Sequence, residues 1–299
     1  MKMGKVNPND LNTPVQITWC PGCGNFGILT AVKGAIADLV NEGFAERKDF
    51  VLTADIGCSS KIYDYLNING FYGLHGRAVP LAVGIKLANP ELRVIAFGGD
   101  GGLLNEGIAH MVHAARYNSD VTVVLHNNQV FALTTGQATA TTERGFKGKS
   151  TPLGTFEEPL NPIALMIESG ATFVAREFSY DVVHLRETLK AAIKHRGFSV
   201  VDVLQPCVSF HDTTQYFRER VYRLEEDGHD PHDREAALKR AKEWSYDLDP
   251  DARIPVGIFY VNDEREPYEE GWPSIRKGPF WKRERKRDWR EVVSRYLVE

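Results

Sequence analysis

The chain has 299 residues, 25% of them charged, and a formal net charge of −4 at pH 7. This length allows one large α/β domain or two smaller ones with a sizeable core. The nearly balanced charge excludes a strongly basic nucleic-acid or membrane-surface protein. Residues 1–18 lack the apolar run of a signal peptide, and no window approaches the roughly 18 apolar residues of a membrane helix. We therefore expect a soluble, cytoplasmic protein with no nucleic-acid and no membrane partner.

Apolar runs bounded by turn residues alternate with helical periodicity between residues 24 and 203. This alternation is typical of a parallel sheet covered by helices on both faces. Strands are predicted at 50–55, 93–99, 121–127, 172–176 and 198–204, with helices near 25–42, 75–88, 103–118, 161–169 and 181–195. We expect one doubly wound, mostly parallel α/β domain over residues 1–210.

The remaining segments have less regular patterns. Residues 135–160 are rich in Gly, Thr and Pro, which predicts a long functional loop. Residues 211–299 are predicted to form a C-terminal extension that packs on the domain and on partner subunits, with a helix at 233–244 and a strand at 254–261. The basic tail with Trp281 and Trp289 is interpreted as an arm over a neighbouring subunit rather than as a nucleic-acid patch.

The first candidate site is the stretch "WCPGC", in which Cys20 and Cys23 have the spacing of paired ligands. Alone, this spacing fits a redox dithiol, half of a zinc site or half of an iron–sulfur site. Cys58 and Cys207 are the other cysteines of the chain. Disulfides are rare in a reducing compartment, so the cysteines are predicted to be ligands or buried thiols.

The second candidate site is "FGGDGGLLNEG", followed after a helix and a strand by "HNNQV". Ligands of open α/β sheets bind at the carboxyl ends of strands, where Asp100 and Asn128 are predicted to lie. Gly98, Gly99, Gly101 and Gly102 are expected to let the backbone turn sharply and bring its N–H groups to a diphosphate. Mg²⁺ prefers oxygen ligands, which Asp100, Asn128 and the carbonyl of Val130 would supply.

Together these motifs resemble known families. The aspartate turn and double asparagine resemble the thiamine diphosphate motif of thiamine-dependent enzymes. With "WCPGCG", "DIGCSSK", "LHGRA" and "DVLQPC" in this order, residues 11–265 resemble the β subunit of the 2-oxoacid:ferredoxin oxidoreductases. The resemblance implies a sheet of the thiamine diphosphate-binding type.

The resemblance also implies roles for individual residues. Cys20, Cys23, Cys58 and Cys207 match the four thiolates of one [4Fe–4S] cluster, the number that such a cluster requires. Asp100, Asn128 and Val130 match the Mg²⁺ ligands, and Lys61 and His75 match catalytic positions, Lys61 near the substrate carboxylate. The residues that match the thiamine diphosphate site are Ile56, Gly57, Cys58, Ser59, His75, Gly99, Gly101, Gly102, Ala132 and Leu133.

The implied activity is the coenzyme A-dependent oxidative decarboxylation of a 2-oxoacid to acyl-CoA and CO₂. Electrons would pass one at a time from thiamine diphosphate through the cluster to ferredoxin. The implied assembly contains an α, or an α and a γ, subunit, as an (αβ)₂ unit. Two alternatives remain, a thiamine-dependent synthase or decarboxylase without an external electron acceptor, and an electron-transfer module without thiamine chemistry.

Substrate choice is less well defined by the sequence. Several relatives carry a basic residue in "ALTTGQ", where this chain has Thr135. Arg144, Lys147 and Lys149 in the long loop are hypothesised to meet a distal carboxylate. This favours 2-oxoglutarate as substrate, with pyruvate next.

Overall fold

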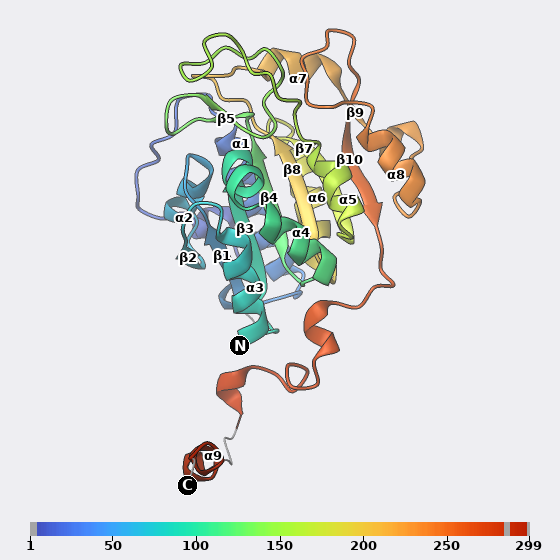
Figure 1. Ribbon diagram of the computed structural model, residues 1–299. Coiled ribbons are helices and arrows are strands. Elements are labelled where there is room, and N and C mark those ends of the chain that lie inside the picture. Colours follow the sequence, from blue (N-terminus) through green and yellow to red (C-terminus); the bar gives the residue numbers. More distant parts are fainter. Residues whose placement is uncertain (1–4, 284–287, 298–299) are drawn as a thin grey trace.

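The computed structural model describes residues 5–283 and 288–297. An eight-stranded sheet forms its centre, with the strand order β2-β1-β3-β4-β8-β7-β10-β9 (Figure 1). Neighbouring strands are parallel except for β10 and β7, which are antiparallel. The prediction of a mostly parallel sheet is confirmed. The strands are β1 (Phe50–Ala54), β2 (Asn69–Tyr72), β3 (Arg93–Gly99), β4 (Thr122–Asn127), β7 (Phe173–Phe178), β8 (Ser199–Leu204), β9 (Val221–Arg223) and β10 (Ile254–Val261).

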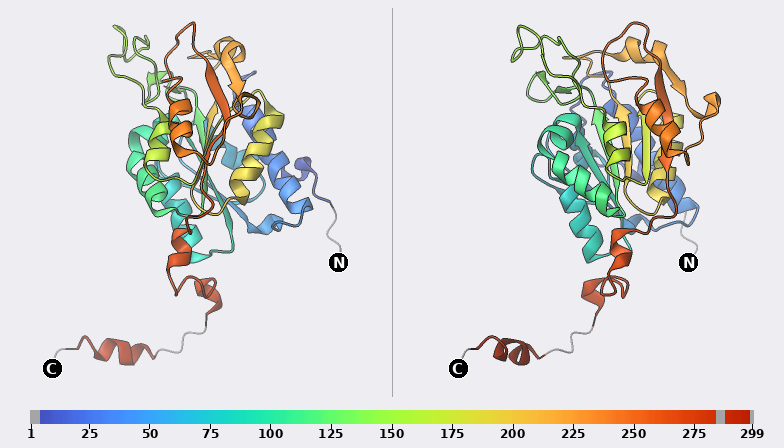
Figure 2. Two further views of the ribbon diagram at one scale, coloured as in Figure 1. Left: turned by 90° about the vertical axis from the view of Figure 1, so that its right-hand side faces the viewer. Right: turned by 45° about the vertical axis from the view of Figure 1, so that its right-hand side comes forward.

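Helices cover both faces of the sheet (Figure 2). One face packs against α1 (Asn25–Asn41) and α6 (Val182–Lys194), and the other against α3 (Ala78–Ala88), α4 (Ile108–Tyr117) and α5 (Pro162–Glu168). Shorter helices are α2 (Ile62–Tyr65), α7 (Thr214–Arg220), α8 (Arg234–Ala241) and α9 (Trp289–Ser294). Single 3₁₀ turns occur at Pro8–Leu11, Arg47–Asp49, Ser59–Lys61, Glu225–Asp227, Tyr268–Gly271 and Phe280–Lys282. Among the described residues, no helix has the length and apolar character needed to cross a membrane.

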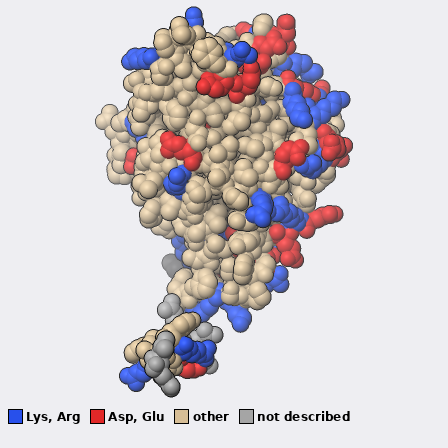
Figure 3. All heavy atoms as spheres, in the orientation of Figure 1, with Lys and Arg blue, Asp and Glu red and all other residues tan. Residues whose placement is uncertain are grey.

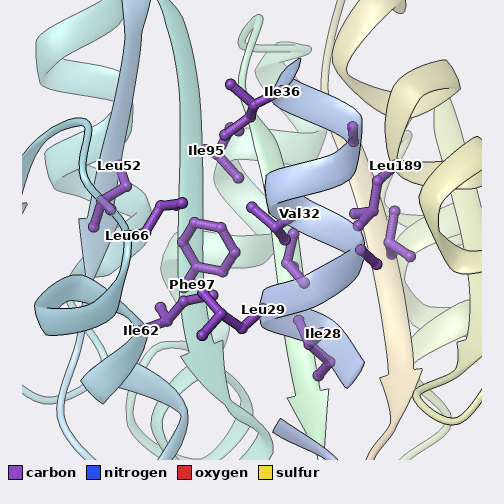
Figure 4. Close-up of a cluster of buried hydrophobic side chains, with 14 of the residues drawn as sticks. Ile28, Leu29, Val32, Ile36, Leu52, Ile62, Leu66, Ile95, Phe97 and Leu189 are labelled. Carbon is purple, nitrogen blue, oxygen red and sulfur yellow. The ribbon is translucent and has the colours of Figure 1, made fainter. Parts of the chain in front are cut away.

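The apolar spacing of α1 explains how the first face is packed. Ile28, Val32 and Ile36 recur at intervals of about one helical turn and point toward the sheet (Figure 4). They meet strand residues such as Phe97, which is fully buried. Strands β4 and β8 are buried along their whole length, as expected for strands covered on both faces.

The predicted elements match with local differences. The helix expected at 103–118 begins instead as a wider π-helical turn, Gly101–Glu106, in which Gly107 N–H donates to the Gly102 carbonyl over 2.8 Å. The α-helix starts only after Gly107. The predicted loop 135–160 contains a short strand, β6 (Gln137–Ala138), paired with β5 (Val130–Phe131).

Residues 211–299 contribute β9 and β10 to the central sheet. Beyond them, an arm ending in α9 stands away from the body of the molecule (Figure 2; the lower part of Figure 3). Trp281 and Trp289 on this arm are exposed. The division at residue 210 and the covering of a neighbouring subunit by the arm stay predictions, and part of the arm, 284–287, lies outside the described residues.

Candidate functional site

A pocket opens at the carboxyl ends of β1, β3 and β4. Its lining brings together four segments that are far apart in the sequence and that contain the candidate site motifs. Every predicted thiamine diphosphate and Mg²⁺ residue lies in this lining, whereas the predicted catalytic residue Lys61 does not. The lining residues are Ile56, Gly57, Cys58, Ser59, His75, Gly99, Asp100, Gly101, Gly102, Asn128, Val130, Phe131, Ala132, Leu133 and Thr134.

Asp100 follows β3 directly and its side chain is buried. Its Oδ2 atom accepts hydrogen bonds from the hydroxyls of Thr139 (2.5 Å) and Thr141 (2.8 Å). Burial raises the pKa of the Asp100 carboxyl to about 6, because the charged form has lost most of its contact with water. A nearby cation would restore the charged form, so this carboxylate fits a metal ligand.

Asn128 lies beside Asp100 in the pocket lining. Its Oδ1 atom accepts the Val130 N–H over 3.1 Å, and its Nδ2 atom donates to Gln205 Oε1 over 3.3 Å. These bonds fix which side of the amide is oxygen. An amide oxygen has two lone pairs, so Asn128 Oδ1 retains capacity for a cation. Asp100, Asn128 and Val130 therefore offer a set of oxygen donors suited to Mg²⁺.

The glycines that follow Asp100 are required by close packing, not by a sharp backbone turn. Gly101 and Gly102 do not have the positive φ of left-handed backbone, contrary to the expectation of a sharp turn. A Cβ on Gly101 would lie 2.2 Å from Phe131 Cε1, and one on Gly102 would lie 1.8 Å from Asp55 Oδ2. No side chain fits at either position, and both backbones line the pocket.

His75 lies at the rim of the pocket, with its ring centroid 5.9 Å from that of Phe131. Its Nδ1 atom is 3.1 Å from Glu106 Oε2. Glu106, which the sequence reasoning did not single out, is the last residue of the π-helical turn. The wider turn therefore brings a carboxylate next to the predicted catalytic histidine.

Asp55 was also missed by the sequence reasoning. It directly follows β1, is fully buried, and accepts a hydrogen bond from the Ser60 hydroxyl. Within the described part of the chain, its Oδ2 atom has no hydrogen-bond partner. Burial raises the pKa of this carboxyl to about 7. Asp55 could have been found from the sequence, because it stands at the end of a predicted strand, and Asp100 in "GGD" stands directly after one.

A second cavity adjoins the first and brings the four cysteines of the chain together. All four are free thiols, and Cys207 is the most buried of them. Burial, with smaller contributions from the neighbouring cysteines, raises the pKa of the Cys23 thiol to about 11. The cavity is lined by Thr18, Trp19, Cys20, Cys23, Asn25, Cys58, Asn128, Ala132, Gln205, Cys207, Val208, Ser209 and Phe210.

All four cysteines line this one cavity. Across residues 5–283 and 288–297, no three His, Cys, Asp or Glu side chains are grouped tightly enough to hold a single metal ion. A zinc ion needs all its ligands about 2.3 Å from one centre. A [4Fe–4S] cluster requires four thiolates, and the lining of this cavity contains four cysteines.

The two cavities share lining residues, and Lys61 contacts the second cavity. Cys58, Asn128 and Ala132 line both of them. Lys61, which lies outside the cofactor pocket, donates from Nζ to the Thr18 hydroxyl over 2.9 Å at the cysteine cavity. Lys61 also lowers the pKa of the Cys58 thiol, against a larger rise from burial.

Two family models match different parts of the chain. Residues 55–203 match a family model described as thiamine pyrophosphate enzyme, C-terminal TPP binding domain. Residues 207–277 match a model for the C-terminal part of the pyruvate ferredoxin oxidoreductase beta chain. The boundary between the two matches falls after the segments that line the first pocket and before Cys207.

Curated proteins are similar over most of the chain. The chain is 48% identical to 2-oxoacid:ferredoxin oxidoreductase 1, subunit beta, of Aeropyrum pernix, over 86% of this chain and 82% of that protein. It is 42% identical to the 2-oxoglutarate synthase subunit KorB of Archaeoglobus fulgidus, over 63% of this chain and 69% of that protein.

A solved structure is similar over almost the whole chain, with a TM-score of 0.87 and 33% sequence identity. It is described as 2-oxoglutarate:ferredoxin oxidoreductase from Magnetococcus marinus with 2-oxoglutarate, coenzyme A and succinyl-CoA bound. The alignment covers 99% of this chain and 98% of that one.

Proposed function

Because the chain belongs to the beta subunits of the 2-oxoacid:ferredoxin oxidoreductases, we propose that it carries out coenzyme A-dependent oxidative decarboxylation of a 2-oxoacid, with ferredoxin as electron acceptor. The observation that carries this proposal is the shared lining of the two cavities, Cys58, Asn128 and Ala132. The proposed decarboxylation site and the proposed electron-accepting site would thereby share part of their lining.

The first cavity is proposed to hold thiamine diphosphate and Mg²⁺. Asp100, Asn128 and the Val130 carbonyl would bind the metal, and the backbones of Gly101 and Gly102 would lie along the diphosphate. Thiamine diphosphate bound there would supply the electron sink that a 2-oxoacid needs to lose CO₂. His75, held near Glu106, is positioned to exchange a proton at the pocket rim.

The second cavity is proposed to hold one [4Fe–4S] cluster on Cys20, Cys23, Cys58 and Cys207. Such a cluster accepts and releases one electron at a time. Thiol pKa values that burial has raised favour the neutral thiol in the metal-free chain. Metal binding would therefore release protons from the cysteines.

The preferred substrate is proposed to be 2-oxoglutarate, with pyruvate second. The similar solved structure is described with 2-oxoglutarate and succinyl-CoA bound. Thr135, which replaces a basic residue of several relatives, has a φ of 79° and offers no charge. Arg144 is exposed in the long loop and pairs with Glu158 over 2.8 Å, and a distal carboxylate would take the place of Glu158.

An α subunit is proposed to complete the active site, in an (αβ)₂ or related assembly. Apolar side chains are exposed in the pocket lining and just before His75 in the sequence: Leu133 (47% exposed) lines the pocket, and Phe71 (53%) and Leu74 (76%) precede His75. Exposed apolar groups clustered at a site are typical of a protein interface. The partner would supply the carboxylate for the aminopyrimidine of thiamine and most of the coenzyme A site. The free cysteines fit a cytoplasmic location.

The test is an assay of the chain co-expressed with its α subunit. We expect reduction of ferredoxin or methyl viologen that requires both coenzyme A and a 2-oxoacid, with 2-oxoglutarate better than pyruvate or 2-oxobutyrate. Release of CO₂ without reduction of the acceptor would support the synthase or decarboxylase alternative. Full activity of the β chain alone would contradict the dependence on a partner.

A further inference from the structure

The side chains that bind the Asp100 carboxylate approach it from one side only. Both loop hydroxyls, those of Thr139 and Thr141, reach the same oxygen, Oδ2. Among the described residues, no side chain donates to Oδ1 of Asp100. One oxygen is thus held by two loop hydroxyls, and the other receives no side-chain donor among the described residues.

Thr141 also contacts a second buried side chain. Its Oγ1 lies 2.8 Å from Asn127 Oδ1, the same distance as from Asp100 Oδ2. The hydroxyl has one hydrogen and both oxygens are acceptors, so Thr141 donates to one of them at a time, and the charged carboxylate is the stronger acceptor. Asn127, the last residue of β4, donates from Nδ2 to Asp202 Oδ1 over 3.0 Å. A chain of polar contacts therefore runs from the pocket into β8.

The chain of contacts continues into residues 211–299, through Tyr246. Tyr246 donates its hydroxyl hydrogen to Asp202 Oδ2. Arg176 of β7 donates to the Tyr246 hydroxyl from Nε (3.1 Å) and Nη2 (2.9 Å), and its Nε lies 3.6 Å from Asp202 Oδ2. Asp202, Tyr246 and Arg176 are fully buried, so water does not compete for these bonds.

The position of Tyr246 is itself maintained against a backbone cost. Its φ is 66°, in the left-handed region that bulky residues rarely adopt. Gln129 donates from Nε2 to the carbonyls of Thr141 (2.7 Å) and Tyr246 (2.8 Å). This residue lies between Asn128 and Val130, and it joins the loop and the C-terminal segment behind the pocket.

The negative and positive side chains along these contacts differ in number. There are two carboxylates, on Asp100 and Asp202, and one guanidinium, on Arg176. Arg176 faces Asp202, so Asp100 has no cationic partner among these residues. An uncompensated buried carboxylate is unfavourable, and a divalent cation in the pocket would balance it.

We propose that Thr141 is a positioning residue for Mg²⁺. It donates its one hydroxyl hydrogen to Asp100 Oδ2 and leaves Oδ1 for the metal, while Asp202, Tyr246 and Arg176 fix Asn127 beside it. This inference rests on the proposed thiamine diphosphate and Mg²⁺ site. Residues that hydrogen-bond to metal ligands commonly contribute 10–100-fold, as an order of magnitude, to metal affinity.

The test compares Thr141→Val, Thr141→Ser and the control Thr122→Val in the co-expressed complex. Thr122 is a buried threonine of β4 whose hydroxyl donates to the Ala192 carbonyl over 3.3 Å, away from these contacts. Mg²⁺ affinity is measured by calorimetric titration in saturating thiamine diphosphate. The ligand environment is measured by the electron paramagnetic resonance spectrum of bound Mn²⁺.

We expect Thr141→Val to weaken Mg²⁺ binding by about 10–100-fold and to change the Mn²⁺ spectrum. Thr141→Ser, which keeps the hydroxyl, and Thr122→Val should match the wild type in both. Unchanged affinity and spectrum in Thr141→Val would overturn the positioning role while the proposed cofactor site stands. Absence of Mg²⁺ binding in the wild type with thiamine diphosphate would instead overturn the cofactor site, and the positioning role with it.

Discussion

Glu143 and His211 lie 3.0 Å apart, measured from Oε2 to Nε2, and both side chains are largely buried. Glu143 belongs to the long loop after β6. His211 exchanges two backbone hydrogen bonds with Cys207, and Phe146 packs edge-on against its ring at 5.0 Å between centroids. The loop near the cofactor pocket is therefore attached to the segment that carries a predicted cluster ligand.

This contact predicts that His211→Ala will loosen the loop. Removing the ring leaves the buried Glu143 carboxylate without this neighbour, an unsatisfied buried polar group costs about 1–3 kcal/mol, and each 1.4 kcal/mol raises the open fraction about tenfold. We expect trypsin to cut after Arg144, Lys147 or Lys149 about tenfold faster in the variant complex. His229→Ala is the control, because that ring bonds to the Phe259 carbonyl over 2.7 Å, far from the loop in sequence. Equal cleavage rates in the two variants would contradict the attachment.

Cys207 and Cys58 should give different phenotypes. Cys207 lines only the cysteine cavity, whereas Cys58 lines both cavities. We expect Cys207→Ser to lose iron, sulfide and visible absorption while thiamine diphosphate still binds. Cys58→Ser should lose the cluster and also bind thiamine diphosphate more weakly. Zinc in place of iron in the wild-type complex, or full iron in Cys207→Ser, would contradict the cluster assignment.

The buried Asp55 carboxyl predicts a pH effect on stability. Its pKa is about 7 in the folded chain, raised from 3.8 chiefly by burial. Since the unfolded chain loses this proton near pH 4, the folded chain binds more protons between about pH 4 and 7, and stability falls as pH rises through that range. Asp55→Asn cannot ionise and should escape this loss.

We therefore expect the melting temperature of the wild-type complex to fall relative to that of Asp55→Asn between pH 5 and 8. One pKa unit corresponds to about 1.4 kcal/mol in the free energy of unfolding. A pKa shift of this size should therefore change the melting temperature by several degrees or more. The exposed Asp64 of the same segment provides the control Asp64→Asn. A constant difference between Asp55→Asn and the wild type across the pH range would show that Asp55 does not titrate as proposed.

The long loop predicts a change in substrate preference. Replacing Arg144, Lys147 and Lys149 together by Gln removes the cations proposed to meet the distal carboxylate of 2-oxoglutarate. A charged hydrogen bond contributes about 1.5–3 kcal/mol, so kcat/KM for 2-oxoglutarate should fall about 10–100-fold while that for pyruvate changes little. Glu158→Gln, which removes the ion-pair partner of Arg144, should not lower it. An unchanged preference would contradict this role.

Much of the fold could be predicted because the strands are short apolar runs bounded by turns. "VTVVLHN" and "FSVVDVL" predicted the central strands β4 and β8, which are fully buried. The antiparallel pairing of β10 with β7 could not be predicted, since an apolar run does not encode which strand lies beside it or in which direction.

The parts of the candidate site that could be predicted are those in which a characteristic residue stands in a short sequence motif. Asp100 and the cysteines stand in short motifs, and the structure gathers them into two adjoining cavities. Thr141 was not predictable, because it approaches Asp100 only through the path of an irregular loop. Tyr246 was hidden for a similar reason, since its contact with Asp202 joins positions 44 residues apart.

The contacts of Tyr246 also bear on how the chain is completed during synthesis. All strands that carry pocket residues are made before residue 205, whereas Tyr246 and β10 follow later. Until that segment docks, Arg176 lacks the rings of Trp244, Tyr246 and Phe259, which lie 4.9–5.2 Å from its guanidinium carbon. We therefore expect a ribosome-bound chain to have a water-accessible underside to the proposed Mg²⁺ site until residues 244–261 dock.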